Sequence, residues 1–163
     1  MNRWHLVYTK PRQEETAFIN LTNQNYESFF PFTLKEKILQ GKKVLMKEPM
    51  FTRYIFVRLN NDGLQNWSPI RSTKGILHLV NFGSHPATLG DEIINILMQK
   101  IGKNLTIKAF SDDDSVEIID GPFKGLKAVF KAYSGEERAI LLLDFMAKHI
   151  HAKFDLRQFK KVA

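Results

Sequence analysis

Apolar residues recur with two different periods in the first thirty positions of the chain. Residues 4–9, WHLVYT, alternate with a period of two, which predicts a β-strand. Pro11 suits the first turn of a helix, and apolar residues then recur at helical spacing up to Asn25, a residue that commonly ends helices. The stretch 26–32 then predicts a second short strand.

The next segment combines a hairpin signal with the clearest strand pattern of the chain. Two short runs flank Gln40-Gly41 within residues 35–47, which predicts a β-hairpin with a basic tip. Residues 50–60 alternate strictly, with Phe51, Arg53, Ile55 and Val57 on one face and Thr52, Tyr54, Phe56 and Arg58 on the other. Because both faces carry large apolar groups, the strand is either buried on both sides or docks a partner with one of them.

A further strand and a helix complete the first part of the chain. A turn at 61–63 precedes a predicted strand over 75–83. A helix then opens at Asp91, and its apolar stripe contains Ile93, Ile94, Leu97 and Ile101. This order of elements predicts an α+β fold in which an antiparallel sheet is flanked by helices. We expect an N-terminal domain over residues 1–101 and a polar linker over 102–114.

The first half of the remaining segment, 115–163, has the pattern of a small β-barrel. In VEIIDGPFKGLKAVF, residues 116–130, two apolar runs are separated by Gly-Pro-Phe-Lys-Gly. A closed barrel of about 50 residues explains this break. In such a barrel Val116 and Ile118 point inward, Gly121-Pro122 turns the chain, Phe123 covers an open end, Gly125 permits a bend, and Ala128, Phe130 and Ala132 line the next strand.

The second half of the same segment has the pattern of a helix. Residues 135–159 contain no glycine or proline after Gly135, and one helical stripe holds Ala139, Leu142, Leu143, Met146 and Ile150. As strands, the same residues require a turn near 147–148, with Ile140 and Leu142 facing the same way. Local propensity and barrel closure therefore disagree in this segment.

Composition narrows the class of protein. The formal net charge is +7, and residues 1–100 supply +5 of it, with 13 Lys and Arg against 8 Asp and Glu. This excess fits a nucleic-acid partner and a merely basic surface equally well. The chain has no cysteine, which excludes a disulfide scaffold, a thiolate zinc site and a cysteine nucleophile. With no signal-peptide run and no apolar stretch of membrane length, we expect a cytoplasmic protein with no membrane partner.

No catalytic or metal-binding motif stands out. We find no Walker loop, no nucleophile placed beside a base and no motif of paired carboxylates. His149 and His151 share a strand face, but no other ligand cluster supports a metal there. We therefore expect neither an enzyme nor a cofactor or metal.

Several quoted motifs resemble NusG-type transcription factors along essentially the whole chain. DGPFKGLKAVF, residues 120–130, resembles their KOW motif, and the first hundred residues look like their N-terminal domain in WHLVYTKPRQEETA, EPMFTRYIFVRL and RSTKGILHLVNFG. Three features look closer to the specialised RfaH type: EKILQGKK at 36–43, Glu48, and GEERAILLL at 135–143.

The resemblance implies a transcription elongation and antitermination factor. Its N-terminal domain would bind bacterial RNA polymerase and non-template single-stranded DNA, and would suppress pausing and termination. In the RfaH type the C-terminal domain is a helical hairpin over the polymerase site in the free, monomeric protein. On release it becomes a KOW barrel that recruits the ribosome through the small subunit. Two rivals stay open: a general NusG factor with a permanent barrel, and a ribosome- or RNA-binding KOW protein.

The resemblance also implies three sets of functional residues. The polymerase-binding set is Tyr8, Phe51, Tyr54, Phe56, Trp67 and Phe82. The DNA-facing set is Lys10, Arg12, Gln13, Asn20, Gln24, Arg71, Thr73 and Lys74. The interdomain set is a Glu48–Arg138 ion pair with Phe130, Leu142 and Met146. The alternatives are ordinary core, a solvated polar face and unrelated surface charges.

The sequence departs from the RfaH pattern at four places. Pro11 stands where that type has an arginine, Asn20 where it has a histidine, and residues 66–68 where it has His-Thr-Thr. Asp113 replaces the glycine that usually precedes the KOW strand. From Pro11 and Asn20 we expect a different DNA preference, whereas residues 66–68 bear on a second polymerase loop and Asp113 on the entry turn of the KOW strand.

Overall fold

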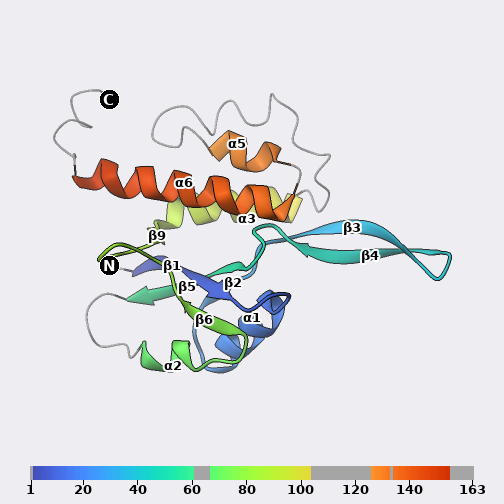
Figure 1. Cartoon of the computed structure of the whole chain (residues 1–163), viewed down its shortest axis with the longest axis horizontal. Helices are drawn as coiled ribbons and strands as arrows, with labels where there is room; N and C mark the ends of the chain where they lie inside the picture. Colours follow the sequence, from blue (N-terminus) through green and yellow to red (C-terminus); the bar gives the residue numbers. More distant parts are fainter. Residues whose placement is uncertain (1, 61–66, 104–125, 133, 155–163) are drawn as a thin grey trace.

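The central element of the fold is an antiparallel sheet built around the first strand (Figure 1). The computed structural model describes residues 2–60, 67–103, 126–132 and 134–154. The strands of the sheet follow the order β2-β5-β1-β6, and β9 also pairs with β1. Their bounds are β1 Asn2–Thr9, β2 Ser28–Phe29, β5 Tyr54–Asn60, β6 Ile76–Leu79 and β9 Thr88–Leu89.

Helices cover both faces of this sheet. In Figure 1, α1 and α2 lie below the sheet, and α3, α5 and α6 lie above it. Their bounds are α1 Glu14–Asn23, α2 Ser68–Arg71, α3 Asp91–Lys103, α5 Leu126–Lys131 and α6 Gly135–Phe154. This is the α+β arrangement predicted from the order of elements, and the helix predicted from Asp91 is confirmed.

Alternation along the central strands divides the buried side chains into two cores. Val7, Ile55 and Val57 pack toward α1 and α2, whereas Leu6 and Phe56 pack toward α3 and α6. Leu6 and Phe56 are direct partners in the β1–β5 register. In this structure the chain itself therefore buries both faces of the strand predicted over 50–60.

A two-stranded arm extends from the body of the protein (Figure 1). Strands β3 (Phe32–Leu39) and β4 (Lys42–Pro49) pair antiparallel over their full length. Gln40 and Gly41 both have positive φ, at 53° and 77°, as the tightest hairpin turns require. The hairpin predicted around these two residues is confirmed. A second small ladder joins β7 (Asn81–Phe82) to β8 (His85–Pro86).

The strand predicted over 50–60 begins later than its alternation suggested. Arg53 has a φ of 72°, and the amide of Tyr54 donates to the carbonyl of Phe51 at 3.0 Å. This turn interrupts the alternation, so β5 starts at Tyr54. Phe51 consequently packs in the same core as Phe56 and not with Ile55, contrary to the predicted alternation.

Other boundaries also differ from the sequence-based prediction. Pro11 lies in a turn, and α1 starts only at Glu14, because Arg12 has a φ of 61° that no helix accommodates. The predicted 75–83 strand is divided at Val80 into β6 and β7. Helix α3 runs to Lys103 and so includes the first two residues of the predicted linker, whose remainder lies outside the described residues. Strands β8 and β9 and helix α2 were not predicted.

The described part of the C-terminal segment consists of two helices, α5 and α6, joined by a short connection. The helix predicted over 135–159 is confirmed as α6 up to Phe154. Ala128 and Phe130, predicted on a barrel strand, lie in α5, and Ala132 follows it, so that prediction is wrong for this structure. The physical reason is that a helix places Val129 and Phe130 against the sheet, where both are buried. The predicted barrel residues Val116, Ile118, Gly121, Pro122, Phe123 and Gly125 lie outside the described residues.

No helix in the described part of the chain is long and apolar enough to cross a membrane.

Candidate functional site

One apolar face of the sheet lies under the C-terminal helices, and we call it the covered face. It is formed by Met50, Phe51 and Phe56, which are at most 2% exposed. The rings of Phe51 and Phe56 meet edge to face, with centroids 6.2 Å apart. From α6, Leu142 and Met146 enter the same core with no exposed surface, and Val129 and Phe130 enter from α5. The predicted interdomain residues Phe130, Leu142 and Met146 therefore all belong to this core.

The first turn of α6 approaches the covered face through backbone contacts. The amide of Thr52 donates to the carbonyl oxygen of Gly135 at 3.1 Å. A Cβ added to Gly135 would lie 2.8 Å from the carbonyl oxygen of Pro49 and would overlap Thr52 Oγ1. Only glycine fits at position 135 without displacing residues 49–52.

Arg138 fixes the same turn of α6 from the inside. It is 1% exposed, and its guanidinium donates to two backbone carbonyls, from Nε to Met50 at 2.6 Å and from Nη1 to Ala132 at 3.1 Å. Nη2 lies 3.9 Å from Glu48 Oε1, and Glu48 also pairs with Lys35 at 3.4 Å. Burial lowers the pKa of Arg138, and the charges of Glu48 and Glu137 partly offset that shift. The predicted Glu48–Arg138 ion pair is thus present but long, and the Glu48 carboxylate pairs with Lys35 as well.

Partly exposed aromatic side chains border the covered face. Tyr8 lies 5.2 Å from Tyr54 and 5.3 Å from His78, measured between ring centroids. The guanidinium of Arg53 lies over the Tyr8 ring, 4.2 Å from its centroid. Burial, with a smaller contribution from Tyr8, raises the pKa of Tyr54. The predicted residue Phe82 also packs against this core and is partly buried.

Trp67 lies away from the rest of the predicted polymerase-binding set. Its ring meets that of His5 at 4.8 Å, and it packs on the opposite core, beside α1 and α2. The structure therefore brings five of the six predicted residues to the covered face or its border and places the sixth on the other side of the sheet. No local pattern around position 67 reveals which face Trp67 occupies, because its ring partner His5, in β1, is 62 positions away.

The predicted DNA-facing residues gather where α1 meets residues 71–75. The amide of Lys10 donates to the carbonyl of Gly75 at 2.8 Å. Gly75 has a φ of 95°, and a Cβ there would lie 3.0 Å from the backbone nitrogen of Ala17. Side chains on this surface divide by exposure: Lys10, Arg12, Gln24, Arg71 and Lys74 are exposed, and Gln13 and Asn20 are half-buried. Thr73 was predicted to face DNA, but it is only 5% exposed, so its hydroxyl does not face solvent.

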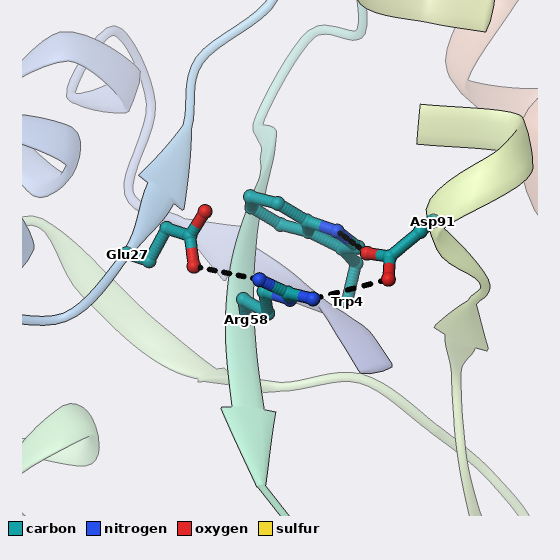
Figure 2. Close-up of polar contacts among 4 residues, drawn as sticks. All are labelled: Trp4, Glu27, Arg58 and Asp91. Atoms are coloured by element: carbon teal, nitrogen blue, oxygen red, sulfur yellow. Dashed lines mark hydrogen bonds and ion pairs between the residues drawn. The ribbon is translucent and has the colours of Figure 1, made fainter. Parts of the chain in front are cut away.

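A polar network that sequence reasoning missed holds the start of α3 against the sheet (Figure 2). Trp4 Nε1 donates to Asp91 Oδ1 at 2.9 Å, and Arg58 Nη2 donates to Asp91 Oδ2 at 3.0 Å. Arg58 Nη1 also donates to Glu27 Oε2 at 3.2 Å. Hydrogen bonding to Glu27 is the main cause that raises the pKa of Arg58. The partners are separated by 31 to 87 positions, which is why no local pattern reveals them.

Within the described ranges, no three His, Asp or Glu side chains come together as a metal site. The predicted binding residues are thus divided between an apolar face under the C-terminal helices and a basic surface beside α1.

Comparison with known proteins identifies the relatives of this chain. The family model described as "Transcription termination factor nusG" matches residues 2–98. The transcription termination/antitermination protein NusG of Thermus thermophilus is 30% identical over 144 residues, covering 74% of this chain and 76% of the relative. The protein of the same name from Deinococcus radiodurans is 23% identical, over 97% and 98% of the two chains. A solved structure described as "Domain interaction in Thermotoga maritima NusG" aligns with 19% identity and a TM-score of 0.40, over 68% of this chain and 61% of that one.

Proposed function

This chain belongs to the NusG family of transcription termination/antitermination factors, and we propose that it is a specialised, RfaH-type member that covers its own polymerase-binding surface. Members of this family are transcription factors and not enzymes. We propose that the chain acts in the cytoplasm on elongating bacterial RNA polymerase, binds the non-template DNA strand, and suppresses pausing and termination.

The observation that carries this proposal is the covered face. Phe51 and Phe56 are fully buried by the same chain that would have to present them to a partner. Helices α5 and α6 supply the cover, and α6 adds Leu142 and Met146 to the apolar contact. Since burial of apolar surface is the main favourable term in most protein association, polymerase and the C-terminal helices would compete for one surface. The free protein is therefore closed, and polymerase binding requires release of the cover.

The pattern of α6 supports a second conformation of the released segment. Ile140 is 67% exposed on α6, although Leu142, two positions away, is fully buried. In a strand, residues two positions apart face the same side, so both would be buried together. A helix that leaves a large apolar residue in water is consistent with a sequence that also serves a barrel. We propose that this KOW barrel contacts the small ribosomal subunit.

Charge around α1 supports the DNA-binding part of the proposal. Lys10, Arg12, Arg71 and Lys74 are exposed, and the amide of Lys10 is bonded to Gly75, the neighbour of Lys74. Helices α1 and α2, to which these segments are joined, lie on the face of the sheet opposite to the C-terminal helices (Figure 1). Lysine and arginine contact phosphate and position a strand without reading its sequence. This surface remains accessible in the closed protein, so DNA can be engaged before the cover is released.

Polymerase binding through the border of the covered face is tested by Tyr54→Ala. We expect polymerase affinity to fall by about 1–3 kcal/mol, as truncation of an aromatic anchor commonly gives. Phe56 is unsuitable for this test, because truncation of a fully buried phenylalanine costs about 3–5 kcal/mol of folding stability. Binding of labelled protein to core polymerase measures the effect. Ile19→Ala, an exposed apolar residue on α1, is the matched control. Equal affinity of the two variants would place the docking site elsewhere.

DNA binding beside α1 is tested by Lys10→Ala. Removal of one phosphate contact should weaken binding to single strands of every sequence and flatten the dependence of log affinity on log salt by about 0.7. Titrations at several salt concentrations measure both quantities. Lys148→Ala removes an exposed lysine from α6 and should change neither. A Lys10 variant with an unchanged salt slope would favour a general NusG factor with no DNA surface here. Failure of the unaltered chain to bind polymerase would favour the RNA-binding rival.

A further inference from the structure

Both hydrogens on the side-chain amide nitrogen of Gln24 are used in hydrogen bonds within the protein. Gln24 follows the last residue of α1, and its Nε2 donates to the carbonyl of Asn20 at 3.1 Å and to Thr73 Oγ1 at 2.8 Å. An amide nitrogen has two hydrogens, so both are used. The first bond also satisfies one of the carbonyls that a helix leaves without a partner at its end.

The chemistry of these two partners fixes which way the amide faces. The carbonyl of Asn20 can only accept. Thr73 Oγ1 donates its single hydrogen to the carbonyl of Pro69 at 2.9 Å, so toward Gln24 it too can only accept. A flipped amide would place Oε1 of Gln24 against two acceptors. Because Thr73 is 5% exposed, water cannot readily relieve that conflict.

We propose that Thr73 is a positioning residue that makes Gln24 a pure hydrogen-bond acceptor toward single-stranded DNA, so that this surface prefers bases carrying an amino group. This inference rests on the DNA-binding part of the proposed function. An unconstrained glutamine reads adenine by donating to one atom and accepting from the next. Here Nε2 has no hydrogen left to donate to a base, and only Oε1 is available, as an acceptor.

An acceptor at Gln24 would distinguish bases by the groups on their edges, while the neighbouring lysines bind the phosphates. Exposed Lys10 and Lys74 hold phosphates of any sequence, and Gln24 adds the discrimination. Cytosine presents an amino group at the position where thymine presents a carbonyl oxygen. An acceptor gains a hydrogen bond from the first and faces a second acceptor in the other. The preference is for amino-bearing bases as a class.

The test uses the full chain and two single strands that differ only in the amino group. One is a twelve-residue deoxycytidine strand, and in the other every base is pyrimidin-2-one, which lacks the 4-amino group. We expect the unaltered protein to bind the cytosine strand about 5- to 10-fold more tightly, which is the effect of one hydrogen bond. Thr73→Val should reduce this ratio, because only the carbonyl of Asn20 then opposes a turn of the amide. Thr73→Ser retains the hydroxyl and should restore it.

The ratio of the two affinities separates positioning from a general structural role. A loosened loop would weaken both strands alike and leave the ratio unchanged, and that result would overturn the proposal. If Thr73→Val does not fold, Gln24→Ala gives the second test, and a ratio that survives it is equally contrary. Failure of the unaltered protein to bind either strand removes the DNA part of the proposed function, whereas tight binding without discrimination removes only this inference.

Discussion

Gly135→Ala is expected to release α6 from the covered face and to increase the affinity for polymerase. The added methyl group would lie 2.8 Å from the carbonyl oxygen of Pro49, closer than real Cβ atoms approach backbone, and would overlap Thr52 Oγ1. Forcing an extra methyl group into a packed contact costs about 1–3 kcal/mol. Alanine is a better helix former than glycine, so any loss of the closed state comes from this contact and not from a weaker helix. Amide spectra of residues 134–154 and polymerase titrations measure the two effects.

Gly90→Ala provides the matched control for this variant. Gly90 too lies at the start of a helix, immediately before α3, but a Cβ there has no atom within 4 Å. We expect the control to remain closed and to bind polymerase like the unaltered chain. A shift of about 1.4 kcal/mol changes the ratio of open to closed protein tenfold, so the difference between the variants is measurable even if most molecules stay closed. If Gly135→Ala stays as closed as Gly90→Ala, the seat of Gly135 does not govern closure.

Arg138→Ala is expected to open the protein far more than Glu48→Ala. The guanidinium donates to the carbonyls of Met50 and Ala132 in a buried setting, and hydrogen bonds from charged groups contribute about 1.5–3 kcal/mol each. Their loss should favour the open state by about 3–5 kcal/mol. The ion pair with Glu48 spans 3.9 Å, and Glu48 also pairs with Lys35, so its removal should cost only about 0–1 kcal/mol.

The two variants are best compared by the fraction of molecules in which residues 134–154 have left the sheet. We expect Glu48→Ala to release only a small fraction of the molecules, and Arg138→Ala to be mostly released. Nuclear magnetic resonance of selectively labelled leucines resolves the two states. An equal released fraction in both variants would mean that the charge pair, and not the carbonyl contacts, holds α6 in place.

Local sequence patterns predicted those elements whose determinants are local. The Gln40-Gly41 turn requires two positive φ values that these residues tolerate, and the α3 stripe of Ile93, Ile94 and Leu97 is a helical repeat. The positive φ of Arg53 has no such signal, because arginine rarely adopts it, and the predicted strand therefore began too early.

The C-terminal segment shows where local patterns are insufficient. Residues 126–154 contain both a helical stripe and a strand alternation, and the choice between them depends on contact with Phe51 and Phe56, at least 70 positions away. The site was predicted to a similar extent. Side-chain type indicated the apolar and basic surfaces. The hydrogen bonds from Arg138 to backbone carbonyls could not be predicted, because every residue has a carbonyl.

The arm formed by β3 and β4 has a consequence for how copies of this protein behave in concentrated solution. It holds Ile38, Leu39 and Leu45 at 74%, 50% and 57% exposure, a composition that in an isolated strand pair invites stacking between copies. The register places Ile38 opposite Lys43 and Leu39 opposite Lys42. Each approach of a second arm thus brings lysine against lysine before apolar side chains can meet. Mutual repulsion between lysines of neighbouring copies therefore opposes self-association and fibril formation.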